Sequence, residues 1–193
     1  MDQQTLVALV VVVAVVVIAA LVIVVLRKRK SQHLKQQFGA EYDRAVLERG
    51  DPAKAEVELI NREKRVQSFS IKELSPTMRD QFRQDWVQVQ NRFVDDPAIA
   101  VSEADSLVNR VMATRGYPMS DFEQRAADIS VTYPAILQNY RAARTIVQRH
   151  GKGQAGTEDL RQAMVHYRSL FDELLGVPNS AAATKGVPYE RAS

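Results

Sequence analysis

An uninterrupted apolar run, LVALVVVVAVVVIAALVIVVL, extends from Leu6 to Leu26 and holds no charged residue, proline or glycine. About 20 apolar residues cross the roughly 30 Å hydrocarbon core of a bilayer as a helix. A segment in lipid must satisfy its backbone hydrogen bonds within itself, which favours a helix even for valine and isoleucine. The run therefore predicts a transmembrane helix at 6–26 that places the chain in the bilayer, with residues 1–5 as a short extracytoplasmic N-terminus.

A cleaved signal peptide is the alternative interpretation of this run. Signal peptides typically have an apolar region of ~7–15 residues, preceded by basic residues and followed by a small-residue cleavage site. Here the preceding residues are MDQQT, and the run ends in Arg27, Lys28, Arg29 and Lys30. These flanks favour an anchor that stays in the protein.

The four basic residues at 27–30 also predict the orientation of the anchor. Lys and Arg beside a span favour the cytoplasmic side, so we expect the N-terminus outside and the rest of the chain in the cytoplasm; the opposite topology remains an alternative. Each basic residue beside an anionic leaflet adds roughly 1 kcal/mol of attraction. Arg27, Lys28, Arg29 and Lys30 are therefore candidate contacts for anionic lipid headgroups, with a plain topology signal as the alternative.

The charge of the chain is concentrated next to the anchor. The net charge is +3, but residues 76–175 hold twelve basic and thirteen acidic side chains. A nucleic-acid-binding domain is expected to carry a basic face. The nearly neutral distal part argues against nucleic acid as a partner, and the absence of cysteine fits a reducing compartment.

The remaining sequence is typical of helices separated by short connecting segments, which predicts an all-α fold. Apolar residues recur every three or four positions, and Asp-Pro, Ser-Pro and glycine mark the ends. We expect a basic helical stalk or hairpin at 27–75, with its first helix running to about residue 48. A compact bundle of four main helices and one short helix follows at 76–175, and residues 176–193 form a disordered tail.

Four carboxylates lie within eleven residues, at Asp95, Asp96, Glu103 and Asp105, and raise the question of a catalytic or metal site. Asp before Pro97 is a preferred N-cap, because its carboxylate accepts the free N–H groups of the first helical turn. Glu103 and Asp105 are expected to point outward from their helix. The cluster is therefore interpreted as helix-capping and surface acids rather than as a catalytic or metal site.

Other chemical motifs are equally sparse. The three histidines, His33, His150 and His166, are scattered, and no metal-binding pattern occurs. The GKGQAG stretch at 151–156 lacks the order of a phosphate-binding loop. We therefore predict no cofactor and no metal, and expect that the protein is not an enzyme.

Arginine and tyrosine on the distal helices form the other candidate site. Both residue types are enriched at binding hot spots, although exposed arginines and half-buried tyrosines are also ordinary features of a bundle. The candidate partner-binding residues are Tyr140, Arg141, Arg144, His166, Tyr167 and Arg168.

Four stretches together resemble a family of small single-pass bacterial membrane proteins with a helical domain. They are FGAEYDRAV at 38–46, RFVDDPAIAVSEAD at 92–105, RGYPMSDFEQRAADISV at 115–131 and TEDLRQAMVHYRSLFDELL at 157–175. The resemblance implies a bacterial inner-membrane protein and carries over no activity or catalytic residue.

Three functional hypotheses follow from the sequence. The first is a membrane-anchored, non-catalytic scaffold or adaptor module that binds a protein partner, with a homo-oligomer as one form. The second is a tethered domain that binds or senses a small ligand. The third is a hydrolase, which requires acids such as Asp95, Glu103 or Asp105 to converge with His150 or His166.

Overall fold

The computed structural model describes residues 3–176, and their side chains from residue 15 onward. These residues form eight α-helices and no strand, which confirms the all-α prediction. The helices are α1 (Gln3–Phe38), α2 (Ala40–Arg49), α3 (Pro52–Gln67), α4 (Pro76–Asp95), α5 (Pro97–Arg115), α6 (Phe122–Thr132), α7 (Pro134–Gly151) and α8 (Thr157–Leu174). The tail predicted at 176–193 lies outside the described residues from 177 onward.

The chain divides into two compact units, Met1–Ile60 and Asn61–Ser193. In the first unit, α1 packs on α2. Leu34, Phe38 and Tyr42 are buried, and the Tyr42 hydroxyl donates a hydrogen bond of 3.0 Å to Glu56 on α3. A narrow apolar stripe is therefore sufficient to hold these helices together.

The expected single helix from residue 27 to about 48 is wrong. The structure ends α1 at Phe38 and starts α2 at Ala40. Gly39, between them, has a backbone φ of +51°. Glycine adopts positive φ at little cost because it has no Cβ, so the chain leaves the helical conformation at this residue.

The predicted membrane span at 6–26 begins before the side chains that the structure describes. Across the described residues, none of the helices combines the length and the apolar character that crossing a membrane requires.

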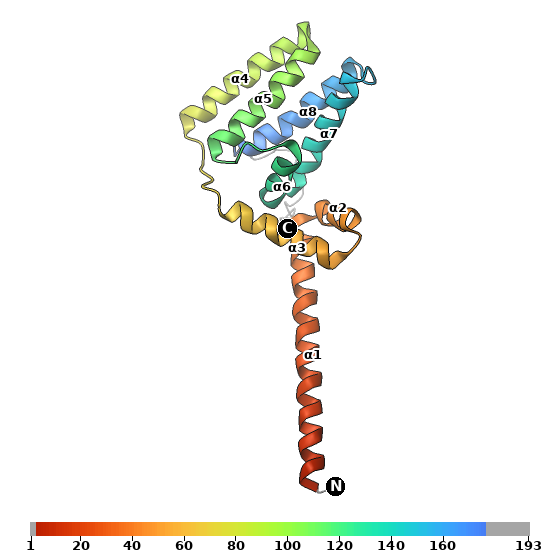
Figure 1. Ribbon diagram of the computed structural model, residues 1–193. Coiled ribbons are helices and arrows are strands. Elements are labelled where there is room, and N and C mark those ends of the chain that lie inside the picture. Colours follow the sequence, from red (N-terminus) through yellow and green to blue (C-terminus); the bar gives the residue numbers. More distant parts are fainter. Residues whose placement is uncertain (1–2, 177–193) are drawn as a thin grey trace, which may run out of the picture. The chain divides into compact units, whose positions relative to one another are not determined.

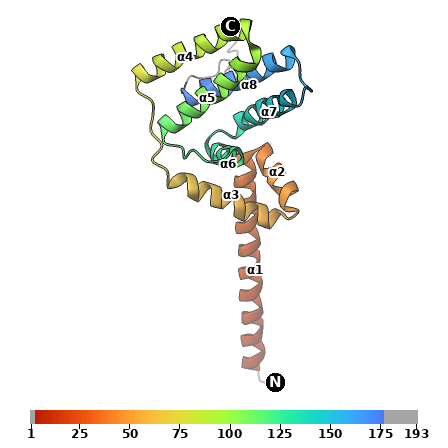
Figure 2. The same ribbon diagram turned by 45° about the horizontal axis from the view of Figure 1, so that its top comes forward.

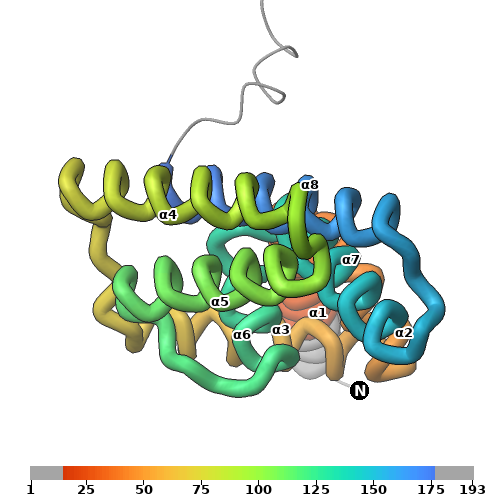
Figure 3. Tube along the Cα trace, turned by 90° about the horizontal axis from the view of Figure 1, so that it is seen from above, coloured from red at the N-terminus to blue at the C-terminus, as the bar shows by residue number. Residues whose placement is uncertain are grey.

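The second unit contains the predicted bundle. Helix α5 packs against both α4 and α8, α8 also packs against α7, and α7 packs against α6. Figures 1 and 2 show this order of neighbouring helices, and Figure 3 shows α4 and α8 along one side of the bundle with α5 and α7 beneath them. This unit begins at Asn61, whereas the bundle was predicted from residue 76. It therefore includes the last turns of α3 and the segment before α4.

The helix starts follow the expected capping chemistry. The Asp96 carboxylate accepts a hydrogen bond of 3.0 Å from the backbone N–H of Ile99, and Ser75 caps α4 in the same way through Met78. The Asp121 side chain caps α6 by accepting from the backbone N–H of Gln124. This helix continues to Thr132.

An extended segment between α3 and α4 runs along the end of α5. The backbone N–H of Lys72 donates a hydrogen bond of 2.8 Å to the carbonyl oxygen of Arg115. Gly116 follows with φ +97°, and a Cβ at this position would lie 2.5 Å from the carbonyl oxygen of Ser70. The close backbone approach therefore requires glycine here.

Candidate functional site

A groove with a largely apolar lining lies between α4 and α8 in the described part of the bundle. It has a volume of about 360 Å³. Both flanking helices pack on α5, and their facing side chains leave the groove between them. The lining residues are Trp86, Gln90, Phe93, Arg161, Met164, Val165, Arg168, Ser169 and Asp172.

The floor of the groove rests on an aromatic stack. Trp86 lies against Phe171 with ring centroids 4.8 Å apart and an interplanar angle of 24°. Phe171 is buried, and so is Trp86. The indole N–H of Trp86 is also buried and has no acceptor among the described residues. Stacked aromatic pairs add about 0.5–1.5 kcal/mol beyond their buried area, which makes this floor rigid.

Two arginines on α8 form one wall of the groove. The Arg168 guanidinium lies 5.8 Å from the centre of the Trp86 ring and donates to Asp172 at 2.9 Å. Arg161, two turns earlier, donates two hydrogen bonds to Glu158, at 2.8 and 2.7 Å. These bonds lower the pKa of Glu158 to about 2. The groove thus combines an apolar floor with a wall that carries two arginines, each paired with a carboxylate of α8.

The structure separates the six residues that the sequence proposed for partner binding. Tyr140 and Tyr167 are fully buried and therefore belong to the core, which corrects their assignment to a surface. Arg141 forms an ion pair with Glu123 at 2.9 Å, and Arg144 lies over the Phe122 ring. Only Arg168 reaches the groove.

Sequence reasoning missed most of the groove. Among the lining residues, Arg168 alone was named as a candidate from the sequence. A signal was present, because Arg161, Val165, Arg168 and Asp172 are spaced as one helix face. This face lies beside the core stripe of α8 and could be found only once its neighbour, α4, was known.

The sequence predicted that Asp105 points outward, and the structure corrects this: Asp105 is half-buried and faces the buried Tyr167. Its carboxylate accepts hydrogen bonds from the Tyr167 hydroxyl at 3.0 Å and from Asn109 at 3.1 Å. Tyr140 meets Tyr167 edge to face, with centroids 6.5 Å apart. Burial raises the pKa of both tyrosines, and the Asp105 charge raises that of Tyr167 further.

These tyrosines predict a loss of stability at alkaline pH. A tyrosine whose pKa is raised on folding stabilises the folded protein fully at pH values below its unfolded pKa of about 10. This stabilisation is lost as the pH rises toward the higher pKa of the folded state. Urea unfolding of the wild type between about pH 8 and about pH 11 should show falling stability above pH 10. Tyr167→Phe should show a shallower fall, and an identical slope would contradict the assignment.

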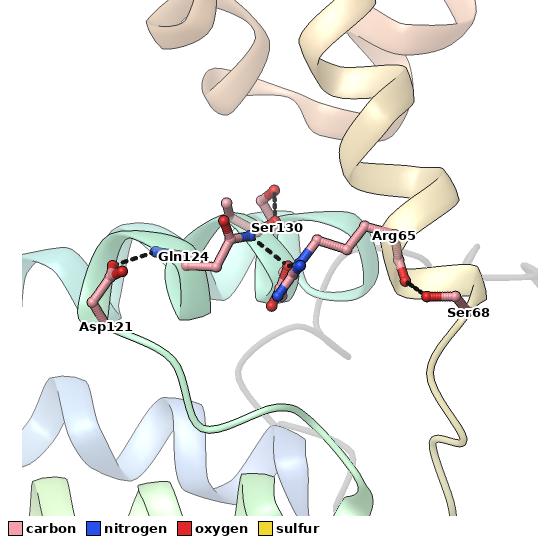
Figure 4. Close-up of polar contacts among 7 residues, drawn as sticks. Arg65, Ser68, Asp121, Gln124 and Ser130 are labelled. Atoms are coloured by element: carbon pink, nitrogen blue, oxygen red, sulfur yellow. Dashed lines mark hydrogen bonds and ion pairs between the residues drawn. The ribbon is translucent and has the colours of Figure 1, made fainter.

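A buried carboxylate, Asp128, joins α6 to the end of α3, and Figure 4 shows Arg65 at the end of α3 beside Gln124 of α6. The Asp128 Oδ1 accepts hydrogen bonds from Arg65 at 3.0 Å and from Gln124 at 2.9 Å. The Asp128 side chain is 1% exposed, whereas that of Arg65 is 42% exposed. Figure 4 also shows Ser68 donating to the Arg65 carbonyl, which ends α3 next to this pair. We call the Arg65–Asp128 pair a clamp, because it holds the end of α3 to α6 within the second unit.

Removing the arginine of this clamp should destabilise the second unit. Arg65→Ala leaves the Asp128 carboxylate buried without its cation, and we expect a loss of about 1–3 kcal/mol. Asp128→Asn preserves the shape and should reduce the cost of Arg65→Ala. A double-mutant cycle by urea unfolding measures this coupling, and additive effects of the two substitutions would contradict the clamp.

Four of the five acids and histidines proposed for a hydrolase have another partner, and the fifth, Asp95, is exposed at the end of α4. Glu103 pairs with Arg92 at 3.5 Å, His166 contacts Asn139 at 3.2 Å, and His150 contacts the carbonyl oxygen of Ala155 at 3.0 Å. Asp105 accepts from Tyr167, as described above. Among the described residues, no three histidine or acidic side chains are placed to hold a metal ion.

No family model, curated protein or solved structure matches the chain. The groove and the buried clusters therefore have to be interpreted from their own chemistry.

Proposed function

We propose that this protein is a membrane-anchored, non-catalytic helical module that binds a protein partner through the α4–α8 groove. The observation that carries the proposal is the combination of an apolar floor with a polar rim in this groove. Protein interfaces typically have this anatomy, with aromatic residues and arginine enriched at the centre. Trp86 and Arg168 provide both residue types in one place.

The exposed side chains of α1 support the anchor at 6–26. From Val15 to Leu26 every side chain is exposed, and the large apolar ones are each about half exposed or more. A contiguous apolar surface of this kind is rare on monomeric soluble proteins and marks a membrane or protein contact. We propose that lipid covers it and that the N-terminus lies outside the cytoplasm.

The basic residues that follow support the same proposal. Arg27, Lys28, Arg29 and Lys30 are all exposed. Four consecutive positions of a helix with 3.6 residues per turn surround its circumference. A ring of cations next to an apolar surface fits the headgroup layer of an anionic leaflet. Together with the family resemblance, this supports placement in the bacterial inner membrane with the bundle in the cytoplasm.

In-cell photo-crosslinking tests the proposed function. Photoreactive residues at Gln90 and Val165, on the two walls of the groove, should give one reproducible protein partner. Matched probes at Gln138 and Thr145, exposed positions on α7, should not. Crosslinks of equal yield from both sets, or from neither, would contradict the groove as the docking site, and self-crosslinks alone would indicate a homo-oligomer.

A small-ligand-binding domain is the second candidate function. The groove volume of about 360 Å³ falls within the range of roughly 300–1,000 Å³ that ligand pockets occupy. A ligand that binds only the folded protein raises the melting temperature according to RT ln(1 + [L]/Kd). Melting of the full-length protein in detergent against metabolite pools distinguishes the two functions, because a protein-binding module should show no shift.

A further inference from the structure

We infer that the α4–α8 groove receives an amphipathic helix of the partner, with carboxylates two helical turns apart beside its apolar stripe. The inference rests on the proposed function and specifies the chemistry of the partner. It is carried by the shape of the groove, the apolar side chains around it and the spacing of its two arginines.

The shape of the groove matches a helix. Its α8 wall follows Arg161, Val165, Arg168 and Asp172, a span of about 16 Å at 1.5 Å per residue. Its α4 wall includes Trp86 and is likewise a row of residues at helical spacing. Helices bind such grooves through apolar side chains at i, i+3 or i+4, and i+7, and walls of about two turns on α4 and about three turns on α8 accommodate this set.

Apolar side chains extend beyond the floor of the groove. Val165 on its α8 wall is 47% exposed, and Val87 and Val94, on α4, are 54% and 84% exposed. Val87 and Val94 each follow a lining residue of α4 by one position, and exposed apolar side chains beside an apolar groove mark interaction sites. An apolar stripe on a docked helix would cover the groove and the side chains beside it.

The arginines specify the charge of the partner. Arg161 and Arg168 are seven residues apart, so they lie on the same face of α8, roughly 10 Å apart along the helix axis. Their carboxylate partners, Glu158 and Asp172, belong to the same helix, and Arg168 also donates to Gln90 on α4 at 3.4 Å. Exposed pairs of this kind contribute little to stability, so carboxylates of a docked helix can replace them. Matching charges at an interface determine the register and the choice of partner.

Fluorescence of Trp86, the single tryptophan of the chain, reports directly on occupation of the groove. The probe is a helical peptide of about 16 residues with leucines at i, i+4, i+7 and i+11 and glutamates flanking them at two-turn spacing. A second peptide carries lysines in place of the glutamates, and a third has a scrambled sequence. Each is titrated into the full-length protein in detergent micelles.

The acidic peptide should bind at least about tenfold more tightly than the lysine peptide, and the scrambled peptide should leave the fluorescence unchanged. Val165→Glu should abolish binding. Val57→Glu, at an exposed valine of α3, is the matched control and should have no effect. Reversing both cations with Arg161→Glu and Arg168→Glu should transfer the preference to the lysine peptide. Thermal melts confirm that each variant is folded.

Several results would overturn the inference. Equal affinity for the acidic and basic peptides would show that the arginines do not select a partner with carboxylates. Binding that persists in Val165→Glu would show that the peptide binds outside the groove. Dodecanoate that competes with the acidic peptide and binds more tightly indicates a small amphiphile, whereas concentration-dependent fluorescence without peptide indicates a second copy of the chain. If groove probes still crosslink one protein while the peptides fail, the proposed function stands and only the helix chemistry is wrong.

Discussion

Replacing Gly116 by alanine is expected to lower the free energy of unfolding by about 2–4 kcal/mol. The backbone φ of +97° is a conformation that residues with a Cβ rarely adopt. The added Cβ would also lie 2.5 Å from the Ser70 carbonyl oxygen. Because the obstructing atom belongs to the backbone, the extended segment before α4 must move and weaken the Lys72–Arg115 hydrogen bond. Urea unfolding of the full-length protein, followed by Trp86 fluorescence, measures the loss.

Gly153→Ala is the matched control for this substitution. Gly153 also has a positive φ, +69°, but a Cβ there meets nothing within 4 Å. It should therefore show only the conformational cost, about 1 kcal/mol. The difference between the two variants isolates the contact with Ser70, and equal losses would mean that the segment before α4 does not lie tightly against the end of α5.

Much of this architecture could be predicted because local chemistry determines it. Asp96 was recognised as a cap because an aspartate before proline satisfies the first N–H groups of a helix within a few residues of sequence. Ser75 and Pro76 open α4 for the same reason. The stripes that form the core were recognisable because one face of each helix is apolar over several turns.

Features that depend on residues distant in sequence were not predictable in this way. Asp105 lies between outward and inward positions of α5, and Tyr167, 62 residues later, makes it a half-buried acceptor. The break at Gly39 was missed because the apolar stripe continues across it from Phe38 to Tyr42. The groove forms between two helices. The sequence of α4 alone does not indicate which of its half-exposed side chains face α8, and the same holds for α8.

The second large effect is expected at Phe171, which supports the groove from below. Phe171→Ala should lower the free energy of unfolding by about 3–5 kcal/mol, because the ring is almost fully buried and its removal leaves a cavity under Trp86. Urea unfolding followed by far-UV circular dichroism measures the loss independently of the tryptophan. Phe93→Ala, at a half-buried residue of the same groove, should cost clearly less.

The same variant links stability to function, because the Trp86 ring depends on Phe171 for its position. The ring centroids of Trp86 and Phe171 lie 4.8 Å apart. Without the Phe171 ring, the indole can move into the cavity, and the floor of the groove changes shape. Peptide affinity should then fall even under conditions where Phe171→Ala is fully folded, whereas Phe171→Leu should recover part of both stability and binding. If Phe171→Ala is destabilised but binds the acidic peptide as well as the wild type does, the aromatic stack serves the core alone, and recognition depends on the arginine wall.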